Sequence, residues 1–171
     1  MFSAAQRRYL FVQNTLGAAF VNLLINGAIG WVITRGLEVF PMWSIPGAAA
    51  DLAATGFGVS FGTCIAARIG VNWEVTRGKI VPPPQFEPYA GWYRRLPRQT
   101  FARSLWFGLW SLPVFALPLL LALTIAGSPA LARMQFVWLK AGFSAVEAAI
   151  VTPLIVLAVL FDLAAERTAP A

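Results

Sequence analysis

The sequence predicts an all-α membrane protein in which four transmembrane helices form an antiparallel bundle with both termini in the cytoplasm. Three observations support this fold class. The 171-residue chain is 58% hydrophobic and 12% charged, where a soluble domain carries about 25% charged residues. It contains four apolar stretches of membrane-spanning length, and its basic residues gather on one side of them. We therefore expect a single integral membrane domain covering residues 1–171.

The four predicted spans cover residues 10–33, 48–69, 105–126 and 136–161. A helix needs roughly 20 apolar residues to cross about 30 Å of hydrocarbon at about 1.5 Å per residue. The apolar runs lack the alternating pattern of barrel strands, so helices are the structure that satisfies this backbone in lipid. The first run is also longer than the apolar core of a secretory signal, which is about 7 to 15 residues.

Orientation follows from the distribution of Lys and Arg, because short basic loops resist transfer across the membrane. Ten basic residues fall on the side of the two termini and of the 70–104 connection. Three fall on the other side: Arg35, Arg133 and Lys140. Indole side chains favour the membrane interface, and six of the seven tryptophans lie at edges of predicted spans. We therefore expect an N-in, C-in protein of a bacterial cytoplasmic membrane.

Small and amide side chains in the first two spans indicate helix packing. The first span carries a stripe with a four-residue repeat: Asn14, Ala18, Asn22, Asn26 and Gly30. Residues four apart share a helix face, and asparagine amides in hydrocarbon need partners, so this face is expected to pack against other helices. Alternatively, Asn22 and Asn26 line a route for a substrate or ion. In the second span, Gly58-x-x-x-Gly62 is expected to seat that helix against the first.

Ionisable residues inside the spans are the main candidates for a polar site, because a charge near the bilayer centre costs on the order of 3 kcal/mol. Glu147 lies roughly 16 Å into the fourth span, near its middle. Lys140, roughly 6 Å in, can extend its ammonium group to the outer surface. Asp51 lies in the first turn of the second span, where it complements the helix dipole and can pair with Lys140.

Two roles for Glu147 remain open on the sequence alone. In the first, Glu147 is a protonatable relay or a group that grips a ligand. In the second, it is a neutral acid that is hydrogen-bonded to the Asn22 and Asn26 stripe.

The 70–104 connection is predicted to be a cytoplasmic amphipathic loop on the membrane surface. Aromatic and apolar side chains recur at helical spacing beside a cluster of arginines. Such a turn can lay its apolar face on the headgroups, and each arginine gains about 1 kcal/mol from anionic lipid. The residues expected to contact headgroups are Trp92, Arg94, Arg95, Arg98 and Arg103. No nucleic-acid-binding motif accompanies these arginines, so we expect no nucleic-acid partner.

Several classes of enzyme are excluded by composition. The chain contains no histidine, which rules out histidine-based metal centres, haem ligation and histidine triads within it. It carries no phosphate-binding loop, dinucleotide fingerprint or nucleophile elbow. We therefore expect a protein that is not an enzyme and that uses neither a metal nor a cofactor.

The first functional hypothesis is a structural or accessory membrane protein that acts through helix–helix association, as a homo-oligomer or within a larger membrane complex. The alternative is an oligomeric small-solute or proton-coupled transporter that uses Glu147 with Asn22 and Asn26. A further hypothesis is an internal duplication that overlays the second span on the fourth and aligns Asp51 with Lys140.

Overall fold

The computed structural model describes residues 4–82 and 90–168. Within these ranges the chain is predominantly helical, and four helical segments are long and apolar enough to cross a membrane: Arg8–Ile33, Ala48–Thr76, Thr100–Ile125 and Arg133–Arg167. The prediction of four helices of spanning length is confirmed. Each segment extends past its predicted limit at the end predicted to be cytoplasmic, because hydropathy ends a span at the first charged residues while the backbone continues its helical hydrogen bonds.

A short helix or strand precedes each of the four segments. The first comprises α1 (Ala4–Arg7), the π-helical turn η1 (Arg8–Asn14) and α2 (Thr15–Ile33), and the second comprises β1 (Val39–Pro41) and α3 (Ala48–Thr76). After the short α4 (Ala90–Tyr93), the third comprises α5 (Thr100–Ser111), the π-helical turn η3 (Leu112–Ala116) and α6 (Leu117–Ile125). The last comprises β2 (Ala130–Ala132) and α7 (Arg133–Thr168). Pro113 has no N–H to donate, which accounts for the irregular turn at η3.

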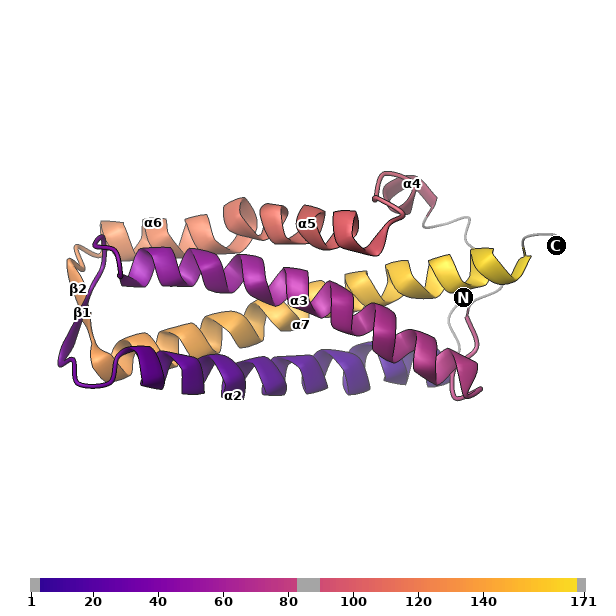
Figure 1. Cartoon of the computed structure of the whole chain (residues 1–171), viewed down its shortest axis with the longest axis horizontal. Coiled ribbons are helices and arrows are strands. Elements are labelled where there is room, and N and C mark those ends of the chain that lie inside the picture. Colours follow the sequence, from indigo (N-terminus) through magenta and orange to yellow (C-terminus); the bar gives the residue numbers. More distant parts are fainter. Residues whose placement is uncertain (1–3, 83–89, 169–171) are drawn as a thin grey trace.

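The helices α3 and α7 cross near the middle of the molecule, and the other two long segments lie on either side of them (Figure 1). The helix α2 packs along α7, whereas α5 packs along α3. At one end, β1 and β2 pair antiparallel, with Phe40 opposite Leu131. Both halves of the chain thus have the order helix, strand, helix. The first long helix of each half packs along the last helix of the other half, α2 along α7 and α5 along α3. This order is what the internal duplication hypothesis requires.

The helix α7 forms the centre of the packing. Two-thirds of its most apolar window is buried, against about a tenth for the first segment. Buried residues of α7 contribute to a cluster with Leu10 and Val71, to a cluster with Cys64 and Phe107, and to one with Phe40 beside the strands. In contrast, no residue of α6 is buried against the described chain. Lys140, Ser144, Glu147 and Thr152 of α7 therefore lie inside the molecule, where buried polar groups need partners.

Candidate functional site

Polar side chains follow one another along the buried length of α7 and meet residues from α2, α3 and α5. From the strand end to the opposite end they are Lys140, Ser144, Glu147, Thr152 and Asp162. Lys140 and Glu147 belong to the predicted polar site, whereas Ser144, Thr152 and Asp162 were not predicted. Thr152 has no hydrogen-bond partner among the described residues, and the other four each have at least one.

Lys140 and Asp51 form an ion pair between α7 and the first turn of α3. The Lys140 Nζ lies 2.5 Å from the Asp51 Oδ2, and the two side chains are 3% and 22% exposed. The predicted pairing is confirmed, but the expectation that Lys140 reaches the outer surface is wrong, because its ammonium group turns inward to Asp51. Gly30 of α2 makes room for the lysine stem: a Cβ at Gly30 would lie 3.4 Å from the Lys140 Cδ.

The α2 stripe packs against another helix, as predicted, only in its strand-side part, which contacts α7, whereas Asn14, Ala18 and Asn22 line a cavity. Asn26 and Gly30 are the buried members of the stripe. The Ser144 hydroxyl donates to the Asn22 carbonyl oxygen at 3.0 Å. The Asn22 amide donates to the Ala18 carbonyl at 2.9 Å, and the Asn26 amide donates to the Asn22 carbonyl at 3.1 Å. Both amides thus find acceptors on their own helix, and close packing involves the Asn26 and Gly30 end of the stripe.

Glu147 is completely buried at the crossing of α3 and α7. The Ser60 hydroxyl of α3 donates to the Glu147 Oε1 at 2.7 Å, and the Oε2 has no hydrogen-bond partner among the described residues. The predicted hydrogen bonds from Asn22 and Asn26 are therefore wrong, because those amides are engaged within α2. Ser60 was missed, since one serine in an apolar run carries no signal that identifies its partner.

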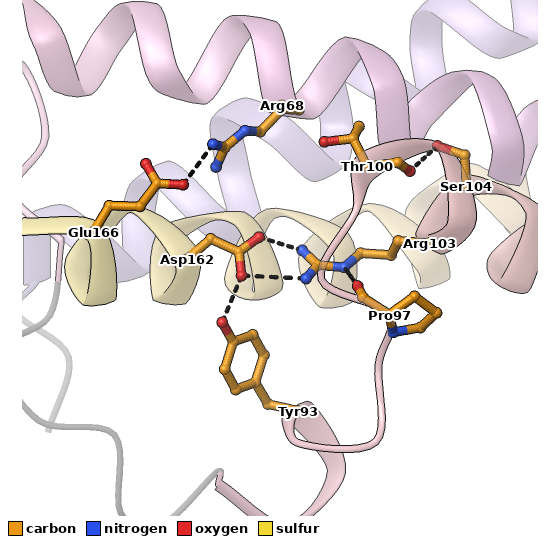
Figure 2. A network of polar contacts seen from close by, with 8 residues as sticks. All are labelled: Arg68, Tyr93, Pro97, Thr100, Arg103, Ser104, Asp162 and Glu166. Carbon is orange, nitrogen blue, oxygen red and sulfur yellow. Dashed lines mark hydrogen bonds and ion pairs between the residues drawn. The ribbon is translucent and has the colours of Figure 1, made fainter. Parts of the chain in front are cut away.

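A second polar network joins the segment before α5 to the last part of α7 (Figure 2). The Arg103 guanidinium donates to both Asp162 carboxylate oxygens, at 2.6 Å and 3.2 Å, and its Nε donates to the Pro97 carbonyl at 2.9 Å. The Tyr93 hydroxyl donates to the same carboxylate at 2.5 Å. The Arg103 and Asp162 side chains are 3% and 13% exposed. One carboxylate thus binds Tyr93 and Arg103, and Arg103 in turn binds the Pro97 carbonyl.

This network corrects the prediction for the 70–104 connection. Arg103 cannot contact headgroups, because it is buried and bound to Asp162. Leu96 is buried, and the Tyr93 ring packs edge-on against Phe161 at 5.4 Å between centroids, so the apolar face of this segment turns toward α7. The helix α7 continues beyond its predicted end at residue 161, and Asp162, the first residue past that end, binds Tyr93 and Arg103.

The remaining headgroup candidates have different outcomes. Arg94, Arg95 and Arg98 are exposed, so headgroup contact stays a prediction for them. The Trp92 side chain lies outside the described part of the structure. Burial and then the hydrogen bond to Asp162 raise the pKa of Tyr93 to about 12, so its phenol holds its proton throughout the neutral range.

A groove lies between η1 and α2 on one side and α3 on the other. One part of it, here called the trough, is a cavity of about 530 Å³ whose lining includes small side chains from both walls: Gly17, Ala18, Gly58, Gly62, Ala66 and Gly70. The expectation that Gly58 and Gly62 seat α3 against α2 is therefore wrong. A Cβ at either glycine would have nothing within 4 Å, because α3 uses a different face, which includes Ser60, to pack on α7.

The trough continues into a second cavity of about 800 Å³, here called the basin, where η1 begins and α3 ends. Tyr9, Gln13 and Glu74 line both cavities. The basin adds the two exposed cations Arg8 and Lys79. Glu147 is not among the residues that line either cavity. Asn14, Asn22 and Thr63 also line the trough. A slot of small and polar side chains thus opens into an end chamber that carries two exposed cations.

The chemistry available to these residues is ion pairing and hydrogen bonding. Within residues 4–82 and 90–168, no group of three or more His, Cys, Asp or Glu residues is placed to hold a metal ion. Comparison of the chain with models of protein families, with curated proteins and with solved structures finds no match.

Proposed function

We propose that the chain is an integral protein of a bacterial cytoplasmic membrane, an antiparallel bundle of four transmembrane helices with both termini in the cytoplasm, and that it acts as a structural or accessory component through helix–helix association. The four segments of spanning length support the membrane assignment. The excess of basic residues at the end opposite the strands supports the orientation.

Labelling with a membrane-impermeant thiol reagent tests the orientation. Gly36→Cys, between α2 and β1, should react in intact cells, whereas Arg95→Cys should react only after the membrane is opened. The natural Cys64 is 1% exposed and contributes little background. Reaction of Arg95→Cys in intact cells would reverse the proposed orientation.

The observation that carries a structural role is that the polar side chains inside the spans join helices of the same chain. Lys140 binds Asp51, Ser144 binds the α2 backbone, and Glu147 accepts from Ser60. Interhelical hydrogen bonds in membranes contribute about 0.6 to 2 kcal/mol each. These residues therefore have a sufficient role in holding the bundle together.

The helix α6 is the surface that this proposal assigns to a partner helix. One face of α6 packs on the chain through the partly buried Leu119, Leu120 and Leu123, whereas its other face, with Leu117, Leu121 and Ile125, is exposed. Membrane helices associate through van der Waals packing, which the exposed face of α6 can provide. The partner is either a second copy or another subunit of a membrane complex.

Oxidative crosslinking in native membranes tests association through α6. The test variant is Leu121→Cys, because the natural Leu121 is 52% exposed. The matched control is Phe20→Cys on α2, where the natural Phe20 is 63% exposed. We expect a crosslinked species from Leu121→Cys and none from Phe20→Cys. A product of doubled mass identifies a second copy. Association through α6 is contradicted if Leu121→Cys gives no crosslinked product and single-molecule photobleaching also shows one copy of the chain per particle.

A proton-coupled transporter is the second candidate, and the observation that favours it is the buried Glu147 with one carboxylate oxygen that lacks a partner among the described residues. Buried acids in membranes are candidates for proton relays. Glu147→Gln keeps the shape and can still accept from Ser60. Unchanged flux of a proton-coupled solute in proteoliposomes removes this role, whereas flux that is lost while the bundle stays folded supports it.

A further inference from the structure

The groove between α2 and α3 is uneven along the length of the helices. The strand-side part of α2 is closed against α7, where a Cβ at Gly27 would lie 3.4 Å from the Ala141 Cβ. The trough begins beyond this region and follows α3 from Gly58 to Glu74. Sixteen residues of helix rise about 24 Å. This length is close to half of a bilayer that is about 40–45 Å thick with its headgroups.

The distance that the groove extends across the membrane indicates what kind of molecule occupies it. A transmembrane helix crosses both leaflets, so a groove built for a helix would continue to the strand end. A phospholipid occupies one leaflet only, with its chains toward the midplane and its headgroup at the surface. The trough ends near the middle of α3 at one end and opens into the basin at the other, which is the arrangement that a lipid requires.

The walls of the trough fit an acyl chain. The glycines at positions 17, 58, 62 and 70 would each have nothing within 4 Å of an added Cβ, so the slot they leave is not filled by this chain's own side chains. Thr152 lies on its floor with 3% exposure, and its hydroxyl has no hydrogen-bond partner among the described residues. An acyl chain offers no hydrogen-bond acceptor, so the fit rests on the open space beside the glycines and not on the Thr152 hydroxyl.

The charges of the basin favour a lipid with an anionic headgroup. Arg8 and Lys79 are exposed there, opposite the single acid Glu74. Arg77 lies beside this rim, with its guanidinium 3.6 Å from the Trp73 ring centre. In the proposed orientation this end meets the cytoplasmic leaflet, where anionic lipids attract cationic side chains. The side-chain amide of Gln13 supplies a neutral hydrogen-bonding group between the two cavities.

We propose that the trough and basin together bind one anionic phospholipid of the cytoplasmic leaflet, with its headgroup at Arg8 and Lys79 and an acyl chain along the glycine-lined trough. The inference rests on the orientation given above and is independent of association through α6. It assigns a role to Gly58 and Gly62, which do not pack against another helix of this chain.

Native mass spectrometry of the full chain tests the site, with phosphatidylglycerol and phosphatidylcholine of identical acyl chains as the two probes. We expect the chain to retain one phosphatidylglycerol in preference to phosphatidylcholine. Replacing both basin cations, Arg8→Gln with Lys79→Gln, should reduce this preference about twenty- to thirty-fold, since each cation near an anionic surface is worth about five-fold in affinity. The control, Arg35→Gln, removes an exposed cation between α2 and β1, outside the basin and outside the predicted headgroup contacts, and should leave the preference unchanged.

A second pair of variants tests the trough. Gly62→Leu fills the slot without a clash, since a Cβ there meets nothing within 4 Å, and it should abolish retention of the lipid. Gly142→Leu on α7 is the matched control, because it also has open space but lies outside the trough. Ala66→Leu is a second blocking variant if Gly62→Leu unfolds.

Three outcomes would overturn the lipid site. The first is equal retention of the two lipids by the natural chain. The second is full retention by a folded trough variant. The third is a protein helix crosslinked to a cysteine at Gly62, which would mean that the groove accepts a helix. Crosslinking of Leu121→Cys is read out separately, so failure of the lipid site and failure of association through α6 can be told apart.

Discussion

Lys140 and Arg103 have equally buried side chains near opposite ends of the bundle, yet their ion pairs are built differently. Lys140 makes one contact with Asp51, which lies at a helix start and is 22% exposed. Arg103 makes a two-pronged contact with Asp162 and also binds the Pro97 carbonyl. A lysine is a point charge on a flexible stem, whereas a guanidinium has fixed directions. The first pair therefore joins two helices, and the second also anchors a connecting segment.

The largest effect that distinguishes the two pairs is expected from Asp162→Asn. This change leaves the Arg103 guanidinium buried without a counter-charge, and loss of one partner of a buried pair costs about 3–5 kcal/mol. We expect that loss in the free energy of unfolding, measured by denaturation in detergent micelles. Limited proteolysis should also cut the 93–103 segment faster.

Glu166→Gln is the matched control for Asp162→Asn, because it lies one turn away and breaks the Arg68–Glu166 pair, which is 2.7 Å long but has side chains 29% and 57% exposed. Exposed pairs contribute about 0–1 kcal/mol. Equal losses of stability for the two variants would show that the Arg103 network is no more than a surface contact.

A smaller effect is expected from Asp51→Asn, about 1–3 kcal/mol, because the remaining amide can still hydrogen-bond the Lys140 ammonium and Lys140 has a flexible stem near the strand end. The same denaturation measurement gives the value. A loss as large as that of Asp162→Asn would contradict the difference drawn between the two pairs.

The smallest effect on the free energy of unfolding is expected from Tyr93→Phe, which removes the hydrogen bond from the Tyr93 hydroxyl to Asp162. The pKa of Tyr93 is about 12 in the folded chain and about 10 when unfolded. The folded chain therefore holds a proton that the unfolded chain loses, so this contribution to stability is complete below about pH 10 and is lost as the pH rises toward about 12.

Absorbance of the phenolate during an alkaline titration measures the Tyr93 pKa directly. Tyr93→Phe should remove the step near pH 12 and cost about 1 kcal/mol at neutral pH. A Tyr93 phenol that titrates near pH 10 in the folded chain would mean that the hydrogen bond to Asp162 is absent.

Contacts between distant segments were the part that sequence analysis predicted least well. Pairing of Asp51 with Lys140 could be predicted because both lie in apolar runs at similar depth, where a charge has few alternatives. The partner of Glu147 could not, because several polar groups lie at its depth and the helix rotations that choose among them come from packing. Arg103 was assigned to lipid because a basic residue beside aromatic residues has the same pattern whether it faces headgroups or a buried carboxylate.

The sequence by itself determined that the chain is helical, that four segments reach the length of a membrane span, and which end carries the positive charge. Those properties depend on hydropathy and charge summed over many residues, so single contacts do not alter them. Only the tertiary structure decided that α7 lies at the centre, that Asp162 binds Arg103, and that Gly58 and Gly62 border an open groove. Small residues permit close approach without requiring it, and the crossing of α3 over α7 determines which glycines are covered.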